Sequence, residues 1–235
     1  MYKDNQSEVF FSDRNYQAIR QNAFHQAGHV AAIFFNNRHF GLPPIHFQIV
    51  IQSRTGCFDI SSGNTNRHIQ IIGGRIIDPL SISIKECSHH LSLADRSDFL
   101  KALEADIINS LAGPIAEARY VSIRDNEPLN PQMLNFSSLA FYNGSHCNEI
   151  INDYLQCIDE GDQRELKKTA LFQTAYQFVS SRSNWNSISG LAEHILNSRT
   201  NKIDYEIITE ILENKSSESL KNGSYPFENK TFHHN

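Results

Sequence analysis

Two histidines, His25 and His29, lie four residues apart in the sequence Phe24-His-Gln-Ala-Gly-His-Val-Ala-Ala32. On an α-helix this spacing puts the two imidazoles about 6 Å apart along the axis and on nearly the same side, so both can bind one metal ion. The chain has 11 histidines among 235 residues, and chance alone supplies such pairs at that frequency. The spacing therefore needs support from the residues around it.

The pattern of the surrounding helix supplies part of that support. Its apolar residues recur on one face: Tyr16, Ile19, Ala23, Ala27, Val30 and Phe34. His25 and His29 lie roughly 180–220° from the start of this stripe, on the opposite side. Gly28, between them, costs about 1 kcal/mol relative to alanine inside a helix, which indicates close packing or a functional constraint. We expect the pair to face a partly enclosed metal cleft.

The segment His25-Gln-Ala-Gly-His29 resembles the His-Glu-Ala-Gly-His helix of the FtsH-type zinc peptidase domain and its stand-alone relatives. Residues 45–56 resemble the strand and glycine turn that line the family's substrate cleft, and residues 111–119 carry its Gly-x-x-Ala-Glu pattern. Residues 185–196 and 204–212 resemble its C-terminal helical pair. The likeness spans about residues 15–213. It implies a zinc endopeptidase acting on flexible or unfolded polypeptide, which would lie extended along the strand at 45–52.

A catalytic zinc site normally has three protein ligands and a water molecule. In the FtsH-type family the third ligand is an aspartate near the start of a later helix. The resemblance puts Glu149 at that place, after the loop that contains Asn143 and Gly144. Asp153, Glu117 and His146 remain alternatives, and Glu117 is better suited to orient a histidine than to bind the metal.

Glutamine occupies the position of the family's catalytic glutamate. In such peptidases the glutamate takes a proton from the zinc-bound water and passes it to the leaving amine. Gln26 keeps the shape of that residue, but its amide cannot accept a proton at neutral pH. We therefore expect zinc binding with very slow hydrolysis or none. Two origins fit: a Glu→Gln substitution made to stop turnover, or a natural pseudoprotease that binds polypeptide without cutting it.

The composition sets further bounds. A net charge of −5 gives no reason to expect nucleic acid as a partner. No apolar run approaches the ~18 residues of a membrane span, and the N-terminus is too polar for a signal peptide.

The four cysteines form no Cys-x-x-Cys pair, so we interpret them as reduced thiols in a cytoplasmic protein, with Cys147 a small buried hydrophobic residue. No ATPase phosphate loop is present, so any substrate must be flexible or delivered by a partner protein.

Periodicity predicts an α+β fold that is mainly helical, with a small sheet beside the metal helix and a C-terminal helical bundle. The predicted helices are 13–37, capped by Asp13, then 97–121, interrupted at Gly113-Pro114, and 146–158, 164–181, 185–197 and 205–213. The predicted strands are 45–52, 57–60, 69–72 and 76–77. We expect one domain over residues 1–213 and a disordered tail over 214–235.

Overall fold

The computed structural model describes residues 5–53, 67–77, 92–130, 132–158 and 161–221. It confirms an α+β fold that is mainly helical with a small antiparallel sheet. The elements in chain order are α1 (Asn5–His39), β1 (Phe47–Ser53), β2 (Arg67–Gly73), α3 (Leu93–Arg124), η1 (Ser138–Tyr142), α4 (Ser145–Ile158), α5 (Asp162–Ser180), α6 (Arg182–Asn197), β3 (Lys202–Ile203) and α7 (Tyr205–Lys221).

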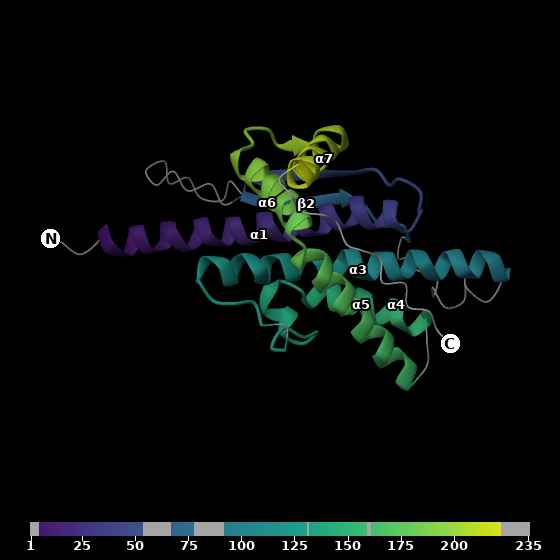
Figure 1. Cartoon of the computed structure of the whole chain (residues 1–235). Helices are drawn as coiled ribbons and strands as arrows, with labels where there is room; N and C mark the ends of the chain where they lie inside the picture. The colour runs from purple at the N-terminus through teal and green to yellow at the C-terminus, as the bar shows by residue number, and fades with distance from the viewer. Residues whose placement is uncertain (1–4, 54–66, 78–91, 131, 159–160, 222–235) are drawn as a thin grey trace.

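The two long helices α1 and α3 lie side by side through the middle of the molecule (Figure 1). The apolar residues of α3 at spacings of three or four are buried from Leu103 to Ala118, because they pack on α1 and on the helices that follow. On α1, Ala23, Ala27 and Val30 are fully buried, while Tyr16 at the start of the predicted stripe is 54% exposed. The small residues of α1 therefore form the centre of the core.

The helices α1 and α3 approach each other closely at a pair of glycines, Gly28 and Gly113. A Cβ atom at Gly28 would lie 2.6 Å from the backbone oxygen of Ala112 and 2.6 Å from the Cβ of Ala116. A Cβ atom at Gly113 would overlap the imidazole ring of His29. Neither position has room for a side chain, which explains why a glycine, Gly28, stands in the middle of α1.

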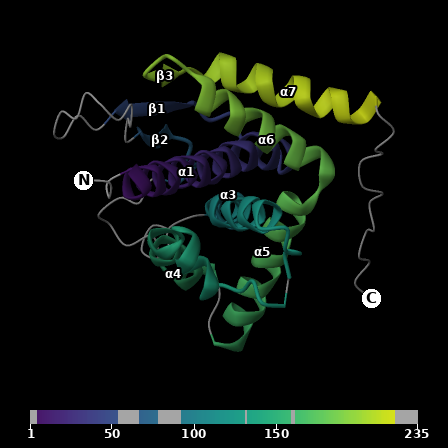
Figure 2. The same cartoon turned by 90° about the vertical axis from the view of Figure 1, so that its left-hand side faces the viewer.

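The sheet covers the side of α1 that faces away from α3 (Figure 2). Its strand order is β2-β1-β3, and all pairings are antiparallel. Gly73 pairs with Phe47 at one end of the β1–β2 ladder, while Ile49 of β1 pairs with Ile203 of β3. The strand at 45–52 is thus central, so the expectation that a substrate would extend the sheet along it is wrong. Among the described residues, β2 and the two-residue strand β3 are the edge strands of the sheet.

The later helices surround the α1–α3 pair. Helices α4 and α5 pack on α3, and α6 packs on α1 with α7 behind it (Figures 1 and 2). An aromatic stack joins three of the helices: the Phe24 ring lies 4.3 Å from that of Tyr120 and 5.5 Å from that of Trp185. Arg119 lies over the other side of this cluster, 4.4 Å from the Trp185 ring. These contacts hold the turn of α1 that leads into His25.

Several predicted boundaries differ from the structure. Helix α1 begins at Asn5, because residues 5–13 contain no proline or glycine to stop it, and Asp13 is not its cap. Residues 76–77 form a bend, and α3 continues through Pro114. Helix α7 runs to Lys221, into the stretch predicted to be disordered. The predicted strand at 57–60 and residues 222–235 lie outside the described residues. No described helix is both long enough and apolar enough to cross a membrane.

The contact at Gly28 predicts a specific loss of stability. Gly28→Ala must push α1 and α3 apart, at a cost of about 1–3 kcal/mol in the free energy of unfolding. Gly190→Ala in α6 is the matched control, because its new Cβ would meet only the flexible side chain of Lys215, and a helical alanine gains up to about 1 kcal/mol. Urea unfolding of both variants measures the difference. Equal stability of the two variants would contradict the close packing at Gly28.

Candidate metal centre

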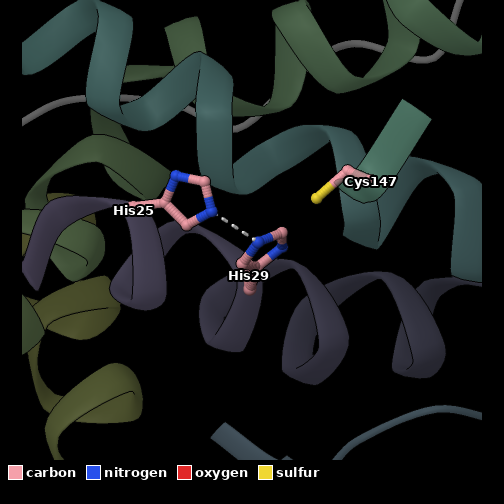
Figure 3. Close-up of side chains that lie close together, drawn as sticks. All are labelled: His25, His29 and Cys147. Atoms are coloured by element: carbon pink, nitrogen blue, oxygen red, sulfur yellow. Dashed lines mark hydrogen bonds between the residues drawn. The ribbon is translucent and has the colours of Figure 1, made fainter. Parts of the chain in front are cut away.

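The imidazoles of His25 and His29 face each other across one turn of α1 (Figure 3). Their Nε2 atoms lie 3.0 Å apart, and the two rings meet edge to face with centroids 4.7 Å apart. His25 is 6% exposed and His29 is half-buried, so the pair lies inside the protein beside α3. The i, i+4 spacing thus brings the two predicted ligands together.

The other ring nitrogen of each histidine faces a hydrogen-bond acceptor. His25 Nδ1 lies 2.9 Å from the carboxylate oxygen Oε2 of Glu117, and His29 Nδ1 lies 2.8 Å from the backbone oxygen of Asn109. A carboxylate and a carbonyl can only accept. Both Nδ1 atoms therefore carry hydrogen and donate it, which fixes the tautomer of each neutral ring.

This tautomer leaves an electron lone pair on each Nε2 atom. Two lone pairs 3.0 Å apart repel unless a cation, either a proton or a metal ion, binds between them. Burial first, and then the charge of His25, lowers the pKa of the His29 imidazole to about 3, so a proton in this gap would be carried by His25 and donated to Nε2 of His29. A divalent metal ion accepts both lone pairs at once, and a histidine ligand that donates Nδ1–H to a carboxylate or carbonyl is the usual arrangement at protein metal sites.

A third donor approaches the histidine pair from α4. The Sγ atom of Cys147 and one nitrogen from each of His25 and His29 all lie within 4.8 Å of one another (Figure 3). Zinc–nitrogen bonds of about 2.0–2.1 Å and a zinc–sulfur bond of about 2.3 Å place tetrahedral donors roughly 3.4–3.6 Å apart. Donors within 4.8 Å of one another could reach this spacing if the Cys147 side chain moved towards the two rings.

The turn before α4 positions Cys147. Asn143 adopts the left-handed conformation, with φ of 55°, at the end of η1, a conformation that asparagine tolerates better than most residues. Gly144 then donates its backbone N–H to the oxygen of Leu139 at 2.9 Å. A Cβ atom at Gly144 would lie 2.6 Å from that same oxygen. This tight turn starts α4 at Ser145 and puts Cys147 in its first turn.

The same turn also orients the carboxylate that holds His25. Asn143 Nδ2 donates to both oxygens of Glu117, at 2.9 and 3.1 Å. Glu117 is 3% exposed and thus has its hydrogen-bond partners inside the protein. The orienting contact predicted as an alternative for Glu117 is present. Asn143, which the sequence placed only in a loop, connects this contact to the segment that carries Cys147.

The donors line a cavity of about 330 Å³ between α1, α3, α4 and the end of β2. Gln26, Gly74, Arg75 and Asp106 line it as well. Asp106 is buried, and this burial raises the pKa of its carboxyl group to about 6 even though the backbone N–H groups of Ile77 and Ile76 lower it. Burial likewise raises the pKa of the Cys147 thiol to about 11.

A larger cavity of about 770 Å³ lies between α5 and the loop before η1, lined by residues such as Phe136, Lys168 and Tyr176. Its described lining contains no histidine, cysteine or aspartate, and its only carboxylate is Glu165. The smaller cavity is therefore the better candidate for metal chemistry.

The residues predicted as the third ligand fall in different places. Glu149 and Asp153 are exposed on α4, and neither belongs to the described group of donors around the two histidines. Cys147 stands in that group where Glu149 was expected, because the helix turns the side chain two residues earlier towards α1. The side chain of His146 lies outside the described residues. Cys147, interpreted from the sequence as a small buried hydrophobic residue, is partly buried, and its Sγ atom belongs to the group that could hold a metal ion.

Gln26 lines the cavity beside the two histidines, as the position of a catalytic glutamate requires. Its Nε2 atom donates to Oδ1 of Asn22 at 3.2 Å, one turn earlier on α1. The amide is therefore held by the helix that carries it and offers no group that can take a proton.

Comparison of the chain with protein-family models, with curated proteins and with solved structures finds no match. Its function must therefore be argued from the geometry of the site.

The site predicts which side chains hold the metal. After zinc loading, we expect one zinc ion per chain, and we expect His25→Ala and Cys147→Ala to lose it. Glu149→Gln is the matched control on the same helix and should keep the full metal content. Glu117→Gln should weaken zinc binding about 10–100-fold, because it removes the charge behind His25. Elemental analysis and competition with a chelator measure these changes. Loss of zinc in Glu149→Gln with retention in Cys147→Ala would reverse the assignment.

The pKa of the Cys147 thiol predicts the pH dependence of metal binding. The thiol keeps its proton below a pH of about 11, whereas a metal ion binds the thiolate. Zinc uptake at pH 7 must therefore release this proton, and affinity should fall about tenfold for each unit by which the pH is lowered. Cys147→Asp supplies a carboxylate without such a proton and should flatten the dependence. Calorimetry in two buffers of different ionisation enthalpy counts the protons, and an unchanged count in Cys147→Asp would contradict the role of the thiol.

Proposed function

We propose that this chain is a zinc-binding protein of the FtsH-type metallopeptidase class in which Gln26 replaces the general base. Polypeptide would bind in the cavity beside α1, and hydrolysis would be very slow. The observation that carries the proposal is the pair of Nε2 atoms of His25 and His29, 3.0 Å apart, with both Nδ1 atoms already bound to acceptors.

The metal would be held by His25 and His29, with Cys147 as the third protein ligand. Histidine and cysteine are both ligands of catalytic zinc, and three protein ligands leave the fourth position open for water or substrate. When bound, zinc polarises a substrate carbonyl and lowers the pKa of its water towards about 7. Glu117 and the carbonyl of Asn109 orient the two rings, and burial keeps His29 neutral and able to bind.

The chain supplies no ready general base at the expected position. Gln26 can hold a water molecule by a hydrogen bond but cannot remove its proton. Asp106 is the only carboxylate among the described residues that line the cavity. Its oxygens already accept hydrogen bonds from the backbone N–H groups of Ile76 and Ile77, at 2.9–3.1 Å. Residues of this chain would therefore bind and orient a polypeptide rather than cut it.

A second candidate function, that of a natural binding module without catalysis, is favoured by a contact of Gln26. The hydrogen bond between Gln26 and Asn22 gives the amide a structural partner that an idle remnant of a catalytic residue would not need. Under this alternative the metal would fix α1 and α4 around a peptide site. The two candidates differ in whether a carboxylate at position 26 is enough to start hydrolysis.

Restoring the carboxylate separates the two candidates. For Gln26→Glu we expect zinc-dependent cleavage of an unstructured polypeptide such as casein, about 10²–10⁴-fold faster than with the chain as it stands. The double variant Gln26→Glu with His25→Ala controls for contaminating proteases and should be inactive. Electrophoresis and mass spectrometry of the products measure cleavage. A zinc-loaded Gln26→Glu protein that cuts nothing would exclude the peptidase and leave the binding module.

A further inference from the structure

The cavity that holds the histidine pair contains one charged side chain with no partner among the described residues, Arg75. It lines the cavity together with His25, His29 and Cys147. No hydrogen bond or ion pair joins its guanidinium group to any residue that the structure describes. Its positive charge contributes a lowering effect to the pKa of His29, and it opposes the larger raising effect of burial on the pKa of Cys147 and Asp106. Arg75 therefore lies near all three residues.

The backbone around Arg75 is held in place on both sides. Before it, Gly73 and Gly74 have φ of 84° and 89°, a region that other residues rarely adopt. A Cβ atom at Gly74 would lie 2.8 Å from Cδ1 of Ile33 on α1. The turn is therefore packed directly on the metal helix and fixes the direction in which the chain leaves β2.

After Arg75, the buried carboxylate of Asp106 holds the chain to α3. It accepts the backbone N–H of Ile76 with both oxygens, at 3.1 Å each, and that of Ile77 at 2.9 Å. Asp106 thus uses its charge on the backbone rather than on the guanidinium beside it. This clamp keeps the backbone of Arg75 at the cavity, and its five N–H donors have no partner among the described residues.

We propose that Arg75 binds a carboxylate group of the ligand that occupies this cavity, while another polar group of the same ligand faces the metal. The guanidinium matches a carboxylate with two parallel hydrogen bonds, which gives orientation as well as affinity. A cavity of about 330 Å³ is at the lower end of the range of about 300–1,000 Å³ for ligand sites. Its size suits a chain end or an acidic residue with its neighbours rather than a long peptide segment.

This inference rests on the proposed function for the metal and adds a ligand class to it. The carboxylate can come from the C-terminus of a peptide or from an acidic side chain within one. Both present the same group to Arg75, and a peptide series separates them.

The test uses the zinc-loaded chain as it is, since slow hydrolysis leaves the ligands intact. Three peptides are titrated by calorimetry: N-acetylated trialanine as the free acid, the same peptide as its C-terminal amide, and an amidated tripeptide with a central glutamate. We expect at least one carboxylate peptide to bind about 10- to 100-fold more tightly than the trialanine amide. Tighter binding of the free acid assigns the chain end, and tighter binding of the glutamate peptide assigns the side chain.

Variants link that preference to Arg75. In Arg75→Gln the carboxylate and amide peptides should bind equally, and Arg75→Lys should keep only part of the difference. Arg199→Gln, an exposed arginine outside the cavity, should behave like the parent chain. Zinc content is measured in each sample, because loss of zinc from the parent chain would refute the proposed function. Full zinc content with no carboxylate preference, or with a preference that survives Arg75→Gln, would overturn the inference about Arg75.

Discussion

The close approach of α1 and α3 at Gly28 and Gly113 is the constraint on which the site depends. Because neither glycine has a side chain, the two backbones come near enough for the His29 ring to lie against α3 and donate to the carbonyl of Asn109. The same proximity brings Glu117, one helical turn after Gly113, within 2.9 Å of His25. Both histidines thus receive their orientation from one helix, and wider separation would remove both contacts together.

The polar groups around the cavity divide into those that orient and those that remain open. Glu117 and the backbone oxygen of Asn109 accept hydrogen bonds from the two rings, and Asn143 donates to Glu117. Asp106 uses its carboxylate on backbone N–H groups. The lone pairs of the two Nε2 atoms, the Cys147 thiol and the Arg75 guanidinium are left facing the cavity. These groups could hold a metal ion with a cation beside it, and they would determine the kind of ligand the site accepts.

The sequence predicted most of the helices and the histidine pair because both follow from short-range rules. The i, i+4 spacing of His25 and His29 settles their geometry once the segment is helical, and the apolar stripe of α3 fixes its buried face. The third donor depends on a turn. A shift of two residues along the start of α4 separates Cys147 from Glu149, and only the left-handed Asn143 and the contact of Gly144 with Leu139 decide between them. The family resemblance pointed to Glu149, whereas the structure places Cys147 beside the two histidines.

The position of Arg75 could not be predicted for a related reason. It lies outside any regular element, and the long-range hydrogen bonds from its neighbours Ile76 and Ile77 to Asp106 hold it in place. Residues 69–72 were recognisable as a strand by their β-branched side chains. Neither periodicity nor turn chemistry predicts which helix the residues after this strand will contact. The sequence therefore gave no indication that Asp106 on α3 would bind the backbone of Ile76 and Ile77.

The placement of Cys147 on α4, apart from the helix that bears both histidines, has a consequence for the whole chain. An ion shared by these three residues would tie together segments separated by more than a hundred positions, as a covalent cross-link does. By mass action, a ligand present at 100 times its dissociation constant adds about 2.7 kcal/mol to the stability of the state that binds it. The amount of folded protein in a cell would then follow the supply of free zinc, and scarcity of the metal would expose the chain to degradation.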